Sequence, residues 1–381
     1  MFDFTFYNPT EIRFGRDREN ELAALLKAAR CERVLLVYGG GSVVRSGLLE
    51  RIQRQLKEAG VAFQEHGGVR SNPVLDHAEA GVQKARSFQA QAIVPIGGGS
   101  VYDEAKAIAV GAKSSAPLWA FYTGRTIEAA LPIYGVLTLA ASGSEMNGNS
   151  VLTNEKTRQK YSFSSRHTYP RVSILNPALT ATVPLDYTAY GAVDAIAHVL
   201  EGYLTKSAHA PLPDEMVEMI VRSVMRTSDR LMEQPDDYDA RAELMWAATL
   251  ALNGLTPAGI GPYSFPNHAI EHAISGLFPD VAHGAGLAVV LPAWMRWHSQ
   301  KNPDPYRQLA QRLFGIDSPQ GGIAALEAWF RTIKAPTRLG EIGIDAAAIA
   351  PLAQHAASLC ESWGLEGYDE ATLRALFEAM V

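Results

Sequence analysis

The chain has 381 residues, of which 47% are hydrophobic and 19% charged, a composition typical of a soluble globular protein with two domains. Its formal net charge is −6 and Lys and Arg are not clustered, which argues against a protein that binds a nucleic-acid backbone. Cys31 and Cys360 form no CxxC pair, so the sequence excludes a disulfide framework and a thiolate zinc site and favours a cytoplasmic protein. The first residues lack the features of a signal peptide, and the apolar run at 286–291 stops at Pro292, too short for a membrane span.

Up to about residue 180, short β-rich runs alternate with amphipathic stretches, which predicts a parallel sheet with crossover helices. The expected strands cover 33–38, a segment beginning at 61–63, 92–96 and 134–139. One helix is expected after the first strand, continuing to about Glu58, and another over 101–110.

Beyond about residue 183, long helical periodicity with few β-branched runs takes over. The expected helices cover 186–204, 213–233, 237–253, 266–275, 305–314, 323–333, 346–362 and 369–380. The sequence therefore predicts an α/β nucleotide-binding domain over 1–183, followed by an all-α domain over 184–381.

Two glycine-rich turns follow expected strands. Gly97-Gly98-Gly99-Ser100 opens a helix with Asp103 and Lys106 one turn in, and Gly39-Gly40-Gly41-Ser42 is similar. Such turns let backbone N–H groups approach a phosphate, although a tight turn without a ligand reads the same way. Neither turn fits G-x-G-x-x-G, because Val44 and Tyr102 stand at the third glycine.

Asp194 and His198 stand four residues apart in an apolar run, so a helix projects both from one face. A buried carboxylate needs compensation, which either a hydrogen-bonded Asp–His pair or a metal ion supplies.

A second histidine cluster favours the metal. His268 and His272 are again four apart, and His283 follows a helix break. One carboxylate and three imidazoles suit Fe(II), Zn(II), Mn(II) or Ni(II), and no His-Glu-x-x-His supports a zinc protease. The remaining histidines sit among polar neighbours and are not included: His66, His77, His167, His209, His298 and His355.

Taken in order, these motifs make the chain recognisable. Gly97 to Lys106, Ser142 to Asn147, Asp194-x3-His198 and His268-x3-His272 with His283-Gly284-Ala285-Gly286 resemble the iron-containing (group III) alcohol dehydrogenases, nearly from end to end. The resemblance is strongest to the branch of NADPH-dependent butanol dehydrogenases and aldehyde reductases. It implies a dehydroquinate synthase-like fold, in which an α/β dinucleotide-binding domain and a helical domain enclose the metal and active site in an interdomain cleft.

By position, the resemblance implies roles for named residues. The implied metal ligands are Asp194, His198, His268 and His283, and His272 is the implied catalytic proton relay. The implied cofactor-binding residues are Gly39, Gly40, Ser42, Asn72, Gly97, Gly98, Gly99, Ser100, Asp103, Thr138, Ser142, Asn147 and Lys160. Without the resemblance, Lys160 would be interpreted as a solvated lysine in a charged stretch.

We expect a metal-dependent alcohol dehydrogenase or aldehyde reductase, a cytoplasmic homodimer that transfers a hydride between NAD(P)H and a short-chain aldehyde or primary alcohol. No acidic residue follows the strand at 34–37 and Arg45 lies nearby, which favours NADP(H) over NAD(H), with Fe(II) or Zn(II) as the metal. Two alternatives are a dehydroquinate-synthase-type lyase and a catalytically silent metal-binding protein. The lyase needs several Lys and Arg beside the metal, and the segments around the expected ligands offer almost none.

Overall fold

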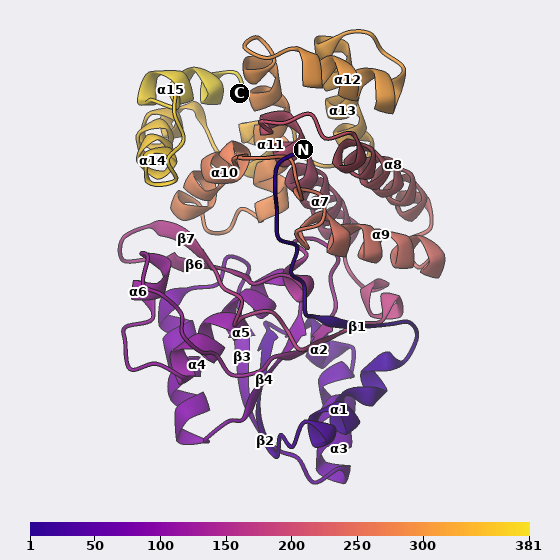
Figure 1. Ribbon diagram of the computed structural model, residues 1–381, viewed down its shortest axis with the longest axis vertical. Helices are drawn as coiled ribbons and strands as arrows, with labels where there is room; N and C mark the ends of the chain where they lie inside the picture. Colours follow the sequence, from indigo (N-terminus) through magenta and orange to yellow (C-terminus); the bar gives the residue numbers. More distant parts are fainter. The chain divides into compact units, whose positions relative to one another are not determined.

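The computed structural model describes all 381 residues, which form two compact units (Figure 1). A six-stranded parallel sheet lies at the centre of one unit, Tyr7–Thr182. The strand order is β1-β8-β5-β4-β2-β3, and every neighbouring pair is parallel. The strands are β1 (Glu11–Phe14), β2 (Arg33–Gly39), β3 (Ala62–Val69), β4 (Ala92–Gly97), β5 (Tyr134–Leu137) and β8 (Val172–Leu175).

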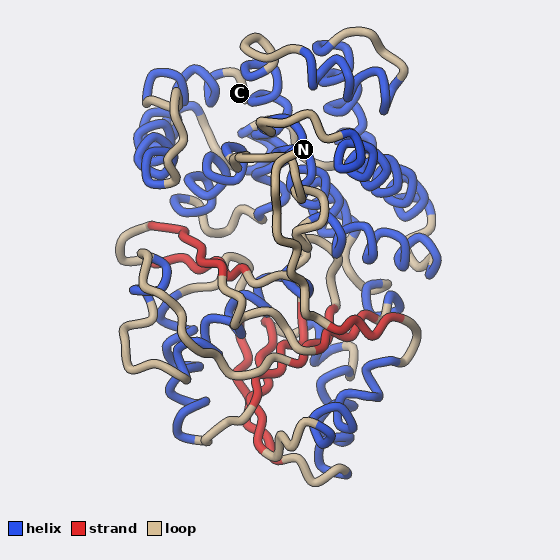
Figure 2. Tube along the Cα trace, viewed as in Figure 1, coloured by secondary structure: helices blue, strands red, loops and turns tan.

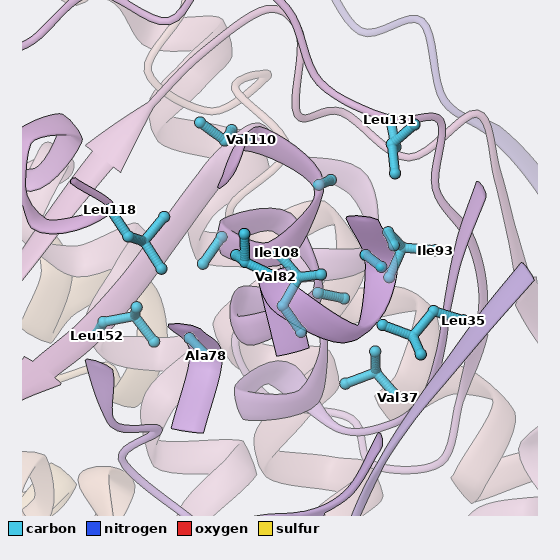
Figure 3. Close-up of a cluster of buried hydrophobic side chains, with 14 of the residues drawn as sticks. Leu35, Val37, Ala78, Val82, Ile93, Ile108, Val110, Leu118, Leu131 and Leu152 are labelled. Carbon is cyan, nitrogen blue, oxygen red and sulfur yellow. The ribbon is translucent and has the colours of Figure 1, made fainter. Parts of the chain in front are cut away.

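Helices cover both faces of this sheet. They are α1 (Leu22–Ala28), α2 (Ser42–Arg45), α3 (Leu48–Glu58), α4 (Leu75–Ser87), α5 (Gly99–Ala112) and α6 (Trp119–Tyr122). Because successive side chains of a strand point to opposite faces, β2 contributes to two cores. Leu35 and Val37 pack with Val82 of α4 and Ile108 of α5 (Figure 3), whereas Val34 and its neighbours pack against α1 and α3.

Two local features differ from the expectations. The helix predicted to run to Glu58 is interrupted between α2 and α3, because Gly47 adopts a left-handed conformation with φ +71°. The charged stretch before Lys160 forms the turn of an antiparallel hairpin of β6 (Asn149–Asn154) and β7 (Gln159–Ser164), which the sequence did not predict.

The second unit, Met1–Phe6 with Val183–Val381, has only helices as regular elements and none of the strands drawn in red in Figure 2. They are α7 (Leu185–Thr205), α8 (Pro211–Glu233), α9 (Tyr238–Ala251), α10 (Pro266–Leu277), α11 (His283–His298), α12 (Asp304–Phe314), α13 (Pro319–Thr332), α14 (Ile349–Ser362) and α15 (Glu370–Glu378), with short 3-10 turns between some of them. The predicted fold class, an α/β domain followed by a helical one, is confirmed.

Helix α11 was not among the expected helices. It contains the apolar run at 286–291 and continues past Pro292, which lies inside the helix. A proline interrupts helical hydrogen bonding, but burial of the flanking Leu291 and Trp294, both 0% exposed, offsets this cost. None of the helices combines the length and apolar character that crossing a membrane requires.

Candidate active site

Three helices bring the four expected metal ligands together, with the three histidines gathered around one carboxylate oxygen of Asp194. Asp194 and His198 lie one turn apart on α7, His268 is in the first turn of α10, and His283 begins α11. From Asp194 Oδ1, the distances are 3.5 Å to His198 Nδ1, 3.9 Å to His268 Nε2 and 3.7 Å to His283 Nε2. Ligand atoms held at about 2.0–2.2 Å from one tetrahedral ion lie about 3.3–3.6 Å apart, so these separations need little adjustment.

The same group contains buried polar atoms without hydrogen bonds. Asp194 Oδ1, His198 Nδ1 and His268 Nε2 have no hydrogen-bond partner, although the three residues are only 4–8% exposed. Each such atom costs about 1–3 kcal/mol when nothing compensates it. The alternative of a hydrogen-bonded Asp194–His198 pair does not account for them, whereas a bound cation satisfies all three.

Electrostatics in the metal-free chain also favour positive charge here. Burial opposes ionisation of Asp194, but the three histidines outweigh it and lower its pKa to about 2. Burial lowers the pKa of His198 to about 4, which leaves a neutral ring able to bind metal. Burial also acts to lower the pKa of His268, but the charges of Glu201 and Asp194 raise it to about 10. The cluster therefore retains a proton where a cation fits.

Two buried glutamates contact imidazoles of the expected ligand set, and sequence reasoning missed both. Glu201 on α7 contacts His268 Nδ1, and Glu271 on α10 contacts His283 Nδ1. Both carboxylates are 0% exposed. An outer carboxylate fixes the tautomer and direction of a metal-binding ring, here leaving each Nε2 towards Asp194. A signal existed, because each glutamate lies three residues after an expected ligand in an apolar helix.

His272 lies beside the ligand cluster. It is 3% exposed, with its ring centroid 5.5 Å from that of His283 and 5.3 Å from that of Trp363. With Glu271 and His283 it forms a group whose ligand-type atoms lie within 4.8 Å of one another. This position suits a proton relay near the metal, and that role stays a prediction.

The expected pyrophosphate-binding turn lies in the other unit, at the carboxyl ends of two adjacent strands. Gly39 ends β2, and Gly97 ends β4 and leads into α5 through Gly98 and Gly99. The amino-terminal N–H groups of α5 suit an anion. A Cβ on Gly99 would lie 2.1 Å from Ser142 Oγ, so the approach of the Ser142 loop requires glycine there.

Buried polar contacts fix the remaining expected cofactor residues. Lys160 is 3% exposed and donates to Asn72 Oδ1 over 2.9 Å, so its interpretation as a solvated lysine is wrong. Asp103 Oδ1 accepts from Ser144 Oγ over 2.6 Å, and Asn147 Oδ1 accepts from Lys106 Nζ over 3.1 Å. Asp103 and Lys106 thereby hold the loop that carries other members of the set.

The backbone N–H of Thr138 donates to Gly97 O over 3.0 Å, which joins this residue to the same end of the sheet. The remaining three members are Gly40, which directly follows β2, and Ser42 and Ser100, which lie in the first turns of α2 and α5. All thirteen expected cofactor residues are in Tyr7–Thr182, whereas the four expected ligands and His272 are in Val183–Val381.

Comparison with known proteins places the whole chain among related enzymes. The family model for iron-containing alcohol dehydrogenase matches residues 9–177, and the C-terminal model of the Fe-containing alcohol dehydrogenase family matches 188–381. The NADH-dependent butanol dehydrogenase B of Clostridium acetobutylicum is 36% identical over 356 residues, covering 91% of this chain and 90% of its own. The NADPH-dependent aldehyde reductase YqhD of Escherichia coli is 34% identical over 365 residues and 92% of both chains. The crystal structure of an NADH-dependent butanol dehydrogenase A from Thermotoga maritima superposes with a TM-score of 0.96 at 40% identity, covering 100% and 99% of the two chains.

Proposed function

Because the chain belongs to the iron-containing alcohol dehydrogenase family, we propose that it reduces short-chain aldehydes to primary alcohols with NADPH and also catalyses the reverse oxidation. It is an oxidoreductase that depends on a nicotinamide cofactor and a metal. The observation that best supports the site is the convergence of His198, His268 and His283 on one oxygen of Asp194. Three of the buried atoms there, Asp194 Oδ1, His198 Nδ1 and His268 Nε2, have no hydrogen-bond partner.

The four ligands account for the metal chemistry. Asp194, His198, His268 and His283 would hold an Fe(II) or Zn(II) ion, which would supply Lewis-acid chemistry to an aldehyde carbonyl. Glu201 and Glu271 keep the rings of His268 and His283 in the ligating orientation.

The other residues bind the cofactor and move the proton. The Gly97–Ser100 turn offers backbone N–H groups to the pyrophosphate, and Lys160, which donates to Asn72, offers a polar group to the cofactor's ribose and nicotinamide side. The His272 imidazole gives a proton to the product alkoxide during reduction and takes it back during oxidation.

The neighbours of the ligands argue against the lyase alternative. A polyanionic sugar acid requires cationic side chains beside the metal. The charged groups that contact His268 and His283 are instead the carboxylates of Glu201, Glu271 and Asp194. This negative surrounding suits a neutral aldehyde substrate.

Our preference for NADPH rests on the turn after β2. Gly39, Gly40 and Gly41 carry no acidic side chain that would repel a 2′-phosphate. The Arg45 Nη1 atom lies 2.9 Å from where a Cβ of Gly41 would stand, so a cation borders the turn. Relatives at similar identity are named for either NADH or NADPH, so the preference needs its own measurement.

A homodimer in the cytoplasm completes the proposal. Exposed aromatic side chains gather in the first seven residues, where Phe2, Phe4, Phe6 and Tyr7 are 45–55% exposed. An apolar segment of this kind is typical of a contact surface between subunits. Sedimentation of the purified chain tests the dimer directly.

The activity test uses purified, Fe(II)- or Zn(II)-loaded protein with NADPH and butanal, followed by the loss of NADPH absorbance. We expect turnover that a chelator abolishes and either metal restores. Conversion of a phosphorylated sugar acid with added NAD⁺, without net reduction of the NAD⁺, would support the lyase. Bound metal with neither activity would support the silent protein.

A further inference from the structure

A second cluster of metal-ligating side chains lies in the α/β unit. His66 on β3, His77 on α4 and Glu104 on α5 have ligand atoms that all lie within 4.8 Å of one another. Glu104 Oε1 is 2.9 Å from His66 Nε2 and 2.6 Å from His77 Nδ1. His66 has polar neighbours in the sequence and was not included among the expected ligands, yet its side chain is only 2% exposed.

Hydrogen bonding leaves this cluster incomplete. Glu104 is 0% exposed, its ion pairs are to the two histidines, and its second oxygen, Oε2, has no hydrogen-bond partner. Both imidazoles direct a nitrogen at the one oxygen Oε1, while His77 Nε2 faces Gly67 O over 3.3 Å. A fully buried carboxylate oxygen without a donor is costly, and protons on the two rings do not satisfy it.

We infer that His66, His77 and Glu104 form a second divalent-cation site that takes Zn(II) or a similar borderline metal. Two imidazoles and one carboxylate are a ligand set that zinc accepts, with water as the fourth ligand. The ion takes the place of the two ring protons that face Glu104 Oε1, and its positive charge also stabilises the unpaired Oε2 of the same carboxylate.

The local geometry fits such an ion. The ligand atoms of a tetrahedral zinc site lie about 3.3–3.6 Å apart, so the two contacts to Oε1 need to lengthen by less than about 1 Å. Gly81 on α4 keeps the space beside His66 open, since a Cβ there would lie 2.9 Å from His66 Nε2. The His77 side chain is 29% exposed, which gives the ion a route from solvent and the water a place.

Charge is consistent with this arrangement. Burial acts to raise the pKa of Glu104, but hydrogen bonds from His66 and His77 lower it overall, so the carboxylate is ionised. Because β3 is the edge strand of the sheet, an ion here fastens that edge to α4 and α5. The expected role is therefore stabilisation of the α/β unit, independent of the Asp194 cluster.

The test counts metal ions in the full-length chain. Chelator-treated protein is dialysed against buffered Zn(II), and zinc per chain is measured by mass spectrometry. We expect two ions in the unaltered protein, one in His77→Gln and Glu104→Gln, and two in the exposed-surface control His167→Gln. His268→Ala should keep one, and His268→Ala with His77→Gln should keep none.

The variants separate this site from the active site. Loss of all zinc in His268→Ala, or at most one ion in the unaltered protein with no change in His77→Gln, would overturn the inference. If His268→Ala loses none while His77→Gln loses one, the second site stands and the proposed active site fails. His77→Gln guards against misfolding of the buried Glu104 variant, and Zn(II) should raise Tm in His268→Ala but not in the double variant.

Discussion

The Glu201 carboxylate contacts Nδ1 of His268, while Nε2 of the same ring lies 3.9 Å from Asp194 Oδ1. Glu201 also accepts a hydrogen bond from the backbone N–H of Asn267, so it binds both the His268 ring and the start of α10. The contact joins α7 to α10 and aims the free nitrogen at the other ligands. We therefore propose that Glu201 positions the His268 ring for metal binding.

Glu201→Gln should weaken metal binding by about 10–100-fold, because a neutral amide orients the ring and raises its basicity less well than a carboxylate. The measurement is a competition titration against a chromophoric chelator. Glu215→Gln, on the exposed surface of α8, serves as the matched control and should bind as the unaltered chain does. Equal affinity in both variants would mean that Glu201 only packs against α10.

His268→Ala should remove stoichiometric metal from the Asp194 cluster and abolish turnover. The fold should survive, because the substitution replaces one ring at the first turn of α10. Metal analysis checks the loss of the ion and far-ultraviolet circular dichroism checks that the fold survives, with His209→Ala at an exposed position as the control. Full activity in His268→Ala would reject the ligand assignment.

Metal binding to the Asp194 cluster should release about one proton near pH 8. In the metal-free chain Glu201 and Asp194 outweigh burial and raise the pKa of His268 to about 10, so its ring is protonated and must lose that proton to ligate. Asp194, with a pKa of about 2, and His198, at about 4, release none. Apparent affinity should thus rise about tenfold per pH unit until about pH 10. Calorimetry in buffers of different ionisation enthalpy measures the proton, and its absence would contradict the raised pKa.

Much of this architecture could be predicted from periodicity and motifs. The fold class follows from the alternation of strand and helix before residue 180 and from the apolar faces of α7 and α10. The spacing of Asp194 and His198 indicates one part of the candidate site. The resemblance added the ligand set and His272, which spacing alone does not distinguish. A single sequence does not show which distant residues meet.

The features that were missed depend on tertiary contacts. Glu201 reaches His268 across 67 positions of sequence, and Lys160 reaches Asn72 across 88. Lys160 looked solvated because its sequence neighbours are charged, yet the β6–β7 hairpin buries it. Polar neighbours in sequence likewise hid the burial of His66.

Gly40→Asp should erode a preference for NADPH. Gly40 is exposed and a Cβ there meets no atom within 4 Å, so the new side chain is accommodated, whereas Gly41 has φ +143° and would be strained. A carboxylate beside the 2′-phosphate should cost about 1–3 kcal/mol, or about 5–150-fold in relative kcat/KM for NADPH over NADH, nearer the lower figure at this exposed site. Gly40→Asn is the neutral control. An unaltered enzyme that prefers NADH would contradict the preference itself.

His272→Ala separates the expected proton relay from the ligands, since His272 shares α10 with His268 and lies next to His283. A relay moves a proton without holding the metal, so the variant should keep its metal and bind NADPH almost normally. The kcat should fall by about 10²–10⁴, with loss of the limb of the pH profile that an imidazole produces. His272→Gln, which keeps a hydrogen-bonding group but does not titrate near neutral pH, should stay slow, because the role requires a group that takes and gives a proton. Loss of metal from either variant would make His272 a ligand and reopen the role of His283, and an unchanged rate and pH profile would leave water to carry the proton.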